Sequence, residues 1–157
     1  MVSVVAAGVF LDQFVKQWAL VDLANGRVIE VVPTFDLRLV FNPGVAFGMG
    51  AGLGPIVAVV LIGVLIGLTG WIAIKVWRGR QLVDVALLSV VLAGGLGNVV
   101  DRVFRAPAGA PLTGEVVDYL AVSWFAIFNL ADVFAVGGVL VWIVVVMLRS
   151  RRQDVAS

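Results

Sequence analysis

Three aspartates are the residues of this chain best suited to acid–base chemistry. Asp101, Asp118 and Asp132 lie in or beside stretches that are apolar enough to belong inside a membrane. A carboxylate close to hydrocarbon is energetically costly, so an acid in such a place indicates a functional site. The chain contains no histidine and no cysteine, which leaves carboxylates as the candidates for this chemistry.

Two carboxylates that meet at a partly dry site repel each other when both are ionised. The pKa of one then rises, and the pair can share a proton, with one acid as general base and the other as general acid. Aspartic peptidases use this device: one carboxylate activates water, and the other polarises the carbonyl group of the substrate. Spacing alone leaves open which of the three aspartates form such a pair.

The composition predicts an integral membrane protein. Of the 157 residues, 62% are hydrophobic and 13% are charged, and the mean hydropathy is +1.12. Soluble domains carry about 25% charged residues. The net charge of +1, without a basic stripe, argues against a nucleic-acid partner. Without histidine or cysteine, a Ser-His-Asp triad, a thiolate nucleophile and most zinc sites are excluded.

Four apolar segments can be placed across a bilayer, and we expect a single membrane domain over residues 1–157. The predicted spans cover residues 1–20, 55–77, 82–101 and 126–148. The first segment has no basic stretch before it and runs into Asp12 and Lys16, so we expect a span rather than a cleaved signal peptide.

Basic residues mark one side of the predicted bundle. They are Lys75, Arg78 and Arg80 between the second and third spans, and Arg149, Arg151 and Arg152 after the fourth. The positive-inside rule places both clusters in the cytoplasm. Both termini are then cytoplasmic as well, and the segments 21–54 and 102–125 are outside.

The external segment 21–54 contains a strand pattern. From Phe35 to Asn42, apolar and polar residues alternate, which is typical of a half-buried strand. Residues 27–31 are the expected partner, with Pro33 at the turn, and a glycine-rich loop follows. The predicted fold is therefore mostly α: a bundle of four transmembrane helices with a small external β-sheet between the first two.

The polar residues of the spans converge at one depth. With a rise of ~1.5 Å per residue, Asp132 lies roughly 25 Å above Arg149 and Asn98 roughly 27 Å above Arg80. The residues that reach this outer level are Asn98, Asp101, Arg102, Asn129 and Asp132. Asp118 can dip to the same level from its external connection. Asp12 and Lys16 fall lower when they are counted from Met1, unless the first span starts outside the hydrocarbon or residues are missing before it.

Each of these residues also has a purely structural explanation. Asn129 and Asp132 fit the cap and first turn of a helix, and Asp101 with Arg102 fits a neutralising pair. Asp118 is the hardest to explain in this way, because V-V-D-Y-L-A-V places an acid in an apolar run without a basic neighbour.

The same holds for the polar residues nearer the helix ends. Lys16 is long enough to extend outward with Asp12 as its counter-ion. Asp84 is expected to be a solvated or capping residue near the inner boundary. The glycines at positions 94, 95 and 97 indicate close helix packing.

Five motifs in a fixed order carry a family resemblance. They are L-D-Q-F-V-K, F-N-P-G-V-A-F-G, G-G-L-G-N-V-V-D-R, V-V-D-Y and F-N-L-A-D. From Leu11 to the fourth span, the chain resembles lipoprotein signal peptidase (signal peptidase II). The resemblance implies a bacterial inner-membrane aspartic endopeptidase that needs no metal or cofactor. It would remove the signal peptide of prolipoproteins just before the diacylglyceryl-modified cysteine.

The resemblance also assigns roles by motif. It makes Asp118 and Asp132 the catalytic pair and leaves Asp101 outside it. The other matching positions, which would support the pair and the substrate, are Asn42, Asn98, Asp101, Arg102, Asn129, Asp12 and Lys16, and Phe47 lies in a loop expected to close over the signal peptide. The implied partners are a diacylglyceryl-prolipoprotein, membrane lipids and, as inhibitors, cyclic peptide antibiotics of the globomycin type.

Other functions place acids or nucleophiles in helices too. A small proton-coupled transporter usually needs more spans or inverted repeats, with its acids near the midplane. A serine–lysine peptidase would use Ser89 or Ser123, although Lys75 lies on the opposite side of the membrane. A purely structural membrane protein would tolerate loss of the acids.

Overall fold

In the part of the chain that the structure describes, four helices are long and apolar enough to cross a membrane. The computed structural model describes residues 1–44, 51–79 and 82–154. The spans are α1 (Val2–Asp22), α2 (Pro55–Trp77), α3 (Leu82–Phe104) and a fourth helix over Leu130–Arg152. The fourth helix comprises α4 (Leu130–Asp132), the π-helical η4 (Val133–Gly137) and α5 (Gly138–Asp154). The predicted four-helix membrane bundle is confirmed.

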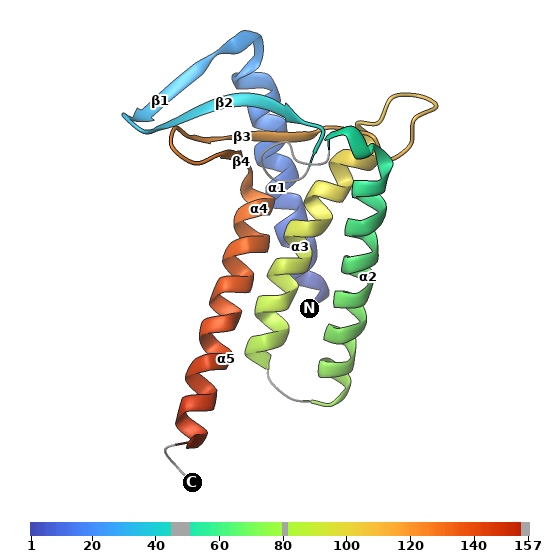
Figure 1. The fold of residues 1–157 in the computed structure, drawn as a ribbon, viewed down its shortest axis with the longest axis vertical. Coiled ribbons are helices and arrows are strands. Elements are labelled where there is room, and N and C mark those ends of the chain that lie inside the picture. Colours follow the sequence, from blue (N-terminus) through green and yellow to red (C-terminus); the bar gives the residue numbers. More distant parts are fainter. Residues whose placement is uncertain (45–50, 80–81, 155–157) are drawn as a thin grey trace.

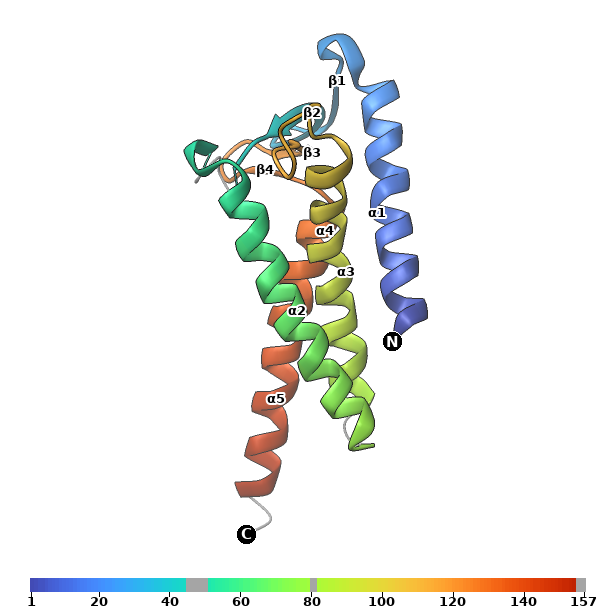
Figure 2. The same ribbon diagram turned by 90° about the vertical axis from the view of Figure 1, so that its right-hand side faces the viewer.

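A four-stranded antiparallel sheet lies across one end of the bundle (Figure 1 and Figure 2). In order, its strands are β1 (Val28–Val32), β2 (Phe35–Asn42), β3 (Val116–Val122) and β4 (Ile127–Phe128). Two short 3-10 turns, η1 (Ala24–Gly26) and η3 (Ala51–Leu53), precede β1 and α2. The predicted hairpin of residues 27–42 is confirmed, but the sheet also recruits two strands from the connection between α3 and the fourth helix.

Strand β3 was not expected because its sequence does not alternate. Val116, Val117, Asp118 and Tyr119 are all buried, so both faces of the strand are covered. A strand buried on both faces is a continuous apolar run, which periodicity cannot distinguish from a helix. Pairing of β4 with β3 also moves the start of the fourth helix from the expected residue 126 to Leu130.

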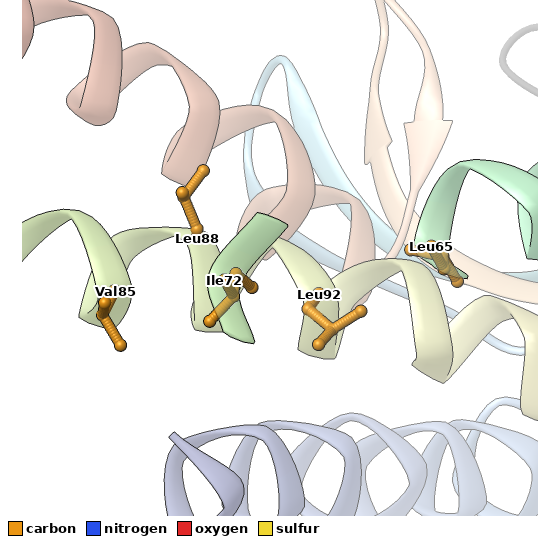
Figure 3. Close-up of a cluster of buried hydrophobic side chains, with 5 residues drawn as sticks. All are labelled: Leu65, Ile72, Val85, Leu88 and Leu92. Carbon is orange, nitrogen blue, oxygen red and sulfur yellow. The ribbon is translucent and has the colours of Figure 1, made fainter. Parts of the chain in front are cut away.

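Helix α3 is the centre of the bundle. Half of its most apolar window is buried, against 22% for α2 and 11% for the fourth helix. Figure 3 shows one packed cluster, in which Leu65 and Ile72 of α2 lie with Val85, Leu88 and Leu92 of α3. The apolar side chains that point outward from the other helices are the surface that lipid would cover.

Glycine allows the closest helix contacts. A Cβ added to Gly94 would lie 2.3 Å from the backbone oxygen of Ala131 at the start of the fourth helix. The expectation that the glycines of α3 mark close packing is confirmed there, because a larger residue would push the fourth helix away from α3.

Asp84 is buried, which corrects the expectation of a solvated or capping residue. Its carboxylate is 2% exposed and forms ion pairs with Lys75 of α2 and Arg149 of α5. Lys75 also lies over the ring of Trp71, which packs edge-on against Trp142. Three helices therefore meet at this cluster, at the end of the bundle away from the sheet (Figure 1).

Candidate active site

The polar residues converge where the sheet meets the bundle. Asp118 lies on β3, opposite Val40 of β2, and its side chain is 2% exposed. Asp132 lies in the first turn of the fourth helix, three residues after the buried Asn129. Because β4 leads from the sheet directly into that helix, the two aspartates are carried by elements that adjoin.

Asp118 and Asp132 are held by one network of amide groups. Asn42 donates to Oδ2 of Asp118 at 2.9 Å, and Asn129 donates to its Oδ1 at 2.7 Å. Asn98 of α3 donates to Oδ1 of Asp132 at 2.8 Å. The backbone N–H of Asn129 donates to Oδ2 of Asp132 at 3.1 Å. Asn129 therefore links both carboxylates.

Asn129 caps the fourth helix and contacts Asp118 at the same time. Its side-chain oxygen accepts from the N–H of Asp132 at 3.0 Å, which completes a capping box. The two ends of an amide have different roles: the oxygen caps the helix, while the NH₂ group is left to donate to Asp118. The expected capping is confirmed, and the residue is also part of the network.

Lys16 is a buried cation that contacts three polar residues next to the two aspartates. Its Nζ is fully buried between Asp12, at 3.0 Å, and Asp101, at 2.9 Å. The same ammonium group donates to Oδ1 of Asn98 at 2.9 Å. An ammonium group has no acceptor, so it fixes which end of the Asn98 amide faces it and turns the NH₂ group toward Asp132.

The expected depth of Lys16 and Asp12 was wrong. Asp12 accepts a hydrogen bond from the N–H of Ala131 at 2.9 Å, so both residues lie level with the start of the fourth helix. Met1 lies partway along the bundle (Figure 1 and Figure 2), so a count from that residue does not start at the end of the bundle away from the sheet. The expected outward extension of Lys16 is also wrong, since its side chain is buried.

Asp101 and Arg102 do not neutralise each other. Asp101 forms ion pairs with Lys16 and Arg105 and accepts a hydrogen bond from the N–H of Val117 at 3.1 Å, which connects α3 to β3. The guanidinium group of Arg102 donates to the carbonyl groups of Pro43, Gly44 and Gly114. Local charge balance predicted the wrong partners because consecutive residues of a helix point in different directions.

Two polar residues of the site were not singled out by the sequence. Gln13 donates to Asp12, to Asp101 and to the carbonyl oxygen of Gly97. The hydroxyl group of Tyr119 accepts from the N–H of Leu130 at 3.2 Å, which joins β3 to the fourth helix. The signal for Gln13 was its place inside L-D-Q-F-V-K beside Asp12. Phe47, also expected near the site, lies outside the described residues.

The absence of a side chain at Gly97 leaves room for the carboxylate of Asp12. A Cβ at this position would lie 2.5 Å from Oδ2 of Asp12. A side chain on Gly97 would therefore displace the carboxylate that holds both Lys16 and the N–H of Ala131.

Burial raises the pKa of Asp118 to about 6. Hydrogen bonds from Asn42 and Asn129 act in the opposite direction, and the negative charge of Asp132 adds to the increase. In the described part of the chain, no cation forms an ion pair with either aspartate. Burial also raises the pKa of Tyr119 to about 12, so its phenol keeps its proton.

Known proteins match almost the whole chain. The family described as Signal peptidase (SPase) II matches residues 4–148. A lipoprotein signal peptidase of Mycobacterium avium (strain 104) is 37% identical over 148 residues, covering 92% of this chain and 76% of the relative. One of Mycobacterium leprae (strain Br4923) is 38% identical over 148 residues, covering 92% of this chain and 69% of the relative.

The fold has a solved counterpart. A bacterial membrane enzyme, 26% identical in sequence, superposes with a TM-score of 0.75 over 97% of this chain and 89% of its own. The family match and the structural match both extend over nearly the whole chain. This chain belongs to the signal peptidase II family.

Proposed function

We propose that this protein is an intramembrane aspartic endopeptidase that removes the signal peptide of prolipoproteins immediately before the diacylglyceryl-modified cysteine. The observation that carries the proposal is the single amide network around Asp118 and Asp132, in which neither acid has an ion-pair partner among the described residues. The names of the relatives support the substrate class. Membership of a peptidase family does not favour a transporter or a structural protein.

The two aspartates would share one proton. The ionised acid takes a proton from water, whose oxygen attacks the scissile carbonyl carbon, while the protonated acid gives its proton to the carbonyl oxygen. The resulting diol collapses when its hydroxyl proton returns to one acid and the other acid protonates the leaving amine. The C–N bond then breaks, and the pair regains one proton in total. The raised pKa of Asp118 suits this exchange near neutral pH.

The asparagines would hold the carboxylates of Asp118 and Asp132 in position. Asn42, Asn98 and Asn129 donate hydrogen bonds without contributing charge, so they orient the carboxylates without fixing both in the ionised state. A cation in the same position would hold both acids ionised and remove the shared proton.

Arg102 has a supporting role in this proposal. Its guanidinium group donates hydrogen bonds to the chain's own carbonyl groups at Pro43 and Gly44, close to Asn42. Those N–H groups are therefore used within the protein and are not directed at a substrate peptide. We therefore assign it to holding the segment that positions Asn42 against Asp118. The expected closure of a loop around Phe47 over the signal peptide stays a prediction.

The proposed location is the bacterial cytoplasmic membrane, with both termini inside. Lys75, Arg78 and Arg149 lie at the end of the bundle opposite the sheet, which the positive-inside rule places in the cytoplasm (Figure 1). The site is then near the outer face, where water and a lipid-anchored peptide bond can meet. The acyl chains of the substrate would stay in the bilayer, and globomycin-type cyclic peptides would compete for the site.

The test is cleavage of a defined substrate. Purified protein is incubated with a diacylglyceryl-prolipoprotein and, separately, with its unlipidated twin, each with and without EDTA. We expect a cut before the cysteine of the lipidated substrate only, with EDTA having no effect. Equal cleavage of both substrates would contradict the assigned specificity, and no cleavage of either by folded protein would contradict the peptidase function.

A further inference from the structure

The turn between β3 and β4 carries an exposed aromatic cluster that the proposed chemistry does not use. Trp124 is 77% exposed and Phe125 is 57% exposed. Phe125 packs against both Trp124, at 6.0 Å between ring centroids, and Phe128, at 6.3 Å. We name Trp124, Phe125 and Phe128 the aromatic corner.

The aromatic corner is held in place by backbone hydrogen bonds. The N–H of Val122 donates to the carbonyl oxygen of Ala126 at 2.9 Å, and that of Phe125 donates to Val122 at 3.0 Å. Ser123 donates to Thr34 in the turn between β1 and β2 at 3.1 Å, which ties the two hairpin tips together. The rings are thus presented outward by a fixed turn, and their exposure is a property of the fold.

The corner continues the lipid-facing surface of the fourth helix. Val133, Val136 and Leu140 of that helix expose their side chains, and only Asn129 separates Phe128 from the first residue of the helix. Figure 1 shows the β3–β4 turn beside the upper end of the fourth helix, outside the bundle. An apolar stripe that faces hydrocarbon therefore ends in tryptophan and phenylalanine.

The position of the corner along the bilayer fits its composition. If Arg149 lies at the inner boundary, a rise of ~1.5 Å per residue places Leu130 roughly 29 Å above it. The hydrocarbon core is about 30 Å thick. Phe128 and the turn before it then lie at the opposite boundary. Tryptophan is enriched at this level because its ring is apolar and its N–H is polar.

We infer that the aromatic corner inserts into the interfacial layer of the lipid bilayer and holds the sheet at a fixed depth. Its partner is the lipid surface itself. Because Trp124 lies in the connection that follows the strand of Asp118, lipid contact there sets the height of β3 relative to the membrane. This inference concerns membrane contact and stands independently of the peptidase chemistry.

The chain offers a clean test because it contains no native cysteine. Trp124→Cys and Phe125→Cys are each made, spin-labelled and reconstituted in bilayers. Accessibility to oxygen, which partitions into lipid, is compared with accessibility to a water-soluble nickel reagent. Ala108→Cys, exposed in the loop before β3, is the control for water, and Val136→Cys is the control for lipid.

We expect labels at positions 124 and 125 to be several-fold more accessible to oxygen than to nickel, between the values for positions 136 and 108. Values equal to those of position 108 would overturn the inference. Protection that occurs only when signal peptide is added would assign the corner to substrate and also overturn it. Spin–spin broadening at position 124 would assign it to a second copy of the chain, with the same consequence.

A second measurement tests the effect on depth. The double variant Trp124→Ser, Phe125→Ser should lower the oxygen accessibility of a label at position 120, on β3, in bilayers. Leu120 is partly buried, so the fold of the fully labelled protein is checked by thermal unfolding before accessibilities are compared. An unchanged depth in a folded double variant would contradict the anchoring role.

Discussion

Two buried charged clusters lie at opposite ends of this molecule, and they differ in how their acids are neutralised. At the end of the bundle away from the sheet, one carboxylate, Asp84, is shared by two cations, Lys75 and Arg149. At the sheet end, Lys16 is shared by two carboxylates, Asp12 and Asp101. Just beyond Lys16, Asp118 and Asp132 receive hydrogen bonds from asparagine amides instead.

Acids paired with cations join neighbouring helices here, whereas the two acids held by amides are the ones to which we assign proton exchange. A neighbouring cation favours the ionised form of an acid, because protonation would leave the cation unpaired in a dry place. An acid held by neutral donors can lose or gain a proton at a modest cost. Burial of an ionisable group is therefore common to both clusters, and the type of partner is what distinguishes them.

The largest expected effect is on catalysis. Asp118→Asn and Asp132→Asn should each lower turnover of a lipidated substrate by roughly 10²- to 10⁴-fold, because asparagine cannot transfer the proton. Turnover is measured on protein that remains folded and monodisperse in detergent. Asp84→Asn is the matched control and should keep near-normal turnover. The proposed distinction between the two clusters would be contradicted if Asp84→Asn lowered turnover strongly while Asp118→Asn left it near normal.

Removing the shared cation should cost the most stability. Lys16→Met leaves the buried Asp12 without a cation and leaves Asp101 with only the partly exposed Arg105, at a cost of roughly 3–5 kcal/mol. The measurement is the unfolding free energy in detergent. Adding Asp101→Asn to Lys16→Met should recover part of this loss, since one of the two facing charges is removed. Equal stability of Lys16→Met and the unaltered protein would refute the structural role of the ion pairs.

Asp118 should make stability depend on pH. Its pKa is about 6 in the folded protein against 3.8 for the free group, so the folded state binds more protons between these values. Its contribution to stability is complete below about 4 and is lost as the pH rises through 6, by up to roughly 3 kcal/mol. The Asp118→Asn variant should therefore gain stability relative to the unaltered protein as the pH rises from 4 to 7. A pH-independent difference between the two proteins would contradict the raised pKa.

The smallest effect should come from the Asp84 cluster, at the end of the bundle away from the sheet. Lys75 is 17% exposed and Arg149 is 38% exposed, so both cations can reach interfacial water when Asp84 is replaced. Asp84→Asn should cost about 1–2 kcal/mol of unfolding free energy, less than Lys16→Met. Thermal unfolding of the two variants side by side gives the order. A larger loss of unfolding free energy for Asp84→Asn would show that the Asp84 cluster contributes more to stability than the ion pairs of Lys16.

Much of the candidate site could be predicted because its signals are local. Asp118 is conspicuous as an acid in an apolar run, and Asn129 with Asp132 has the spacing of a helix cap. Helix rise correctly brought Asn98, Asp132 and Asn129 to one level, since helix geometry converts residue number into depth.

The ion-pair partners of the buried acids could not be predicted in the same way. Asp101 was matched to its neighbour Arg102, whereas its partners are Lys16 from another helix and Arg105 one turn away. Asp84 was expected to be solvated because nothing in the sequence shows that α5 brings Arg149 beside it. Contacts between distant segments depend on how helices pack, and a local pattern carries no information about that.

The sequence by itself determined that this chain spans a membrane four times, that it carries an external hairpin and that aspartates and asparagines gather at one end. These properties follow from hydropathy and residue spacing. Tertiary structure alone decided that residues 116–122 form a central strand, that Asn129 caps a helix while it contacts Asp118, and that Lys16 orients Asn98. The reason is that burial and hydrogen-bond geometry arise only when segments far apart in the chain are packed together.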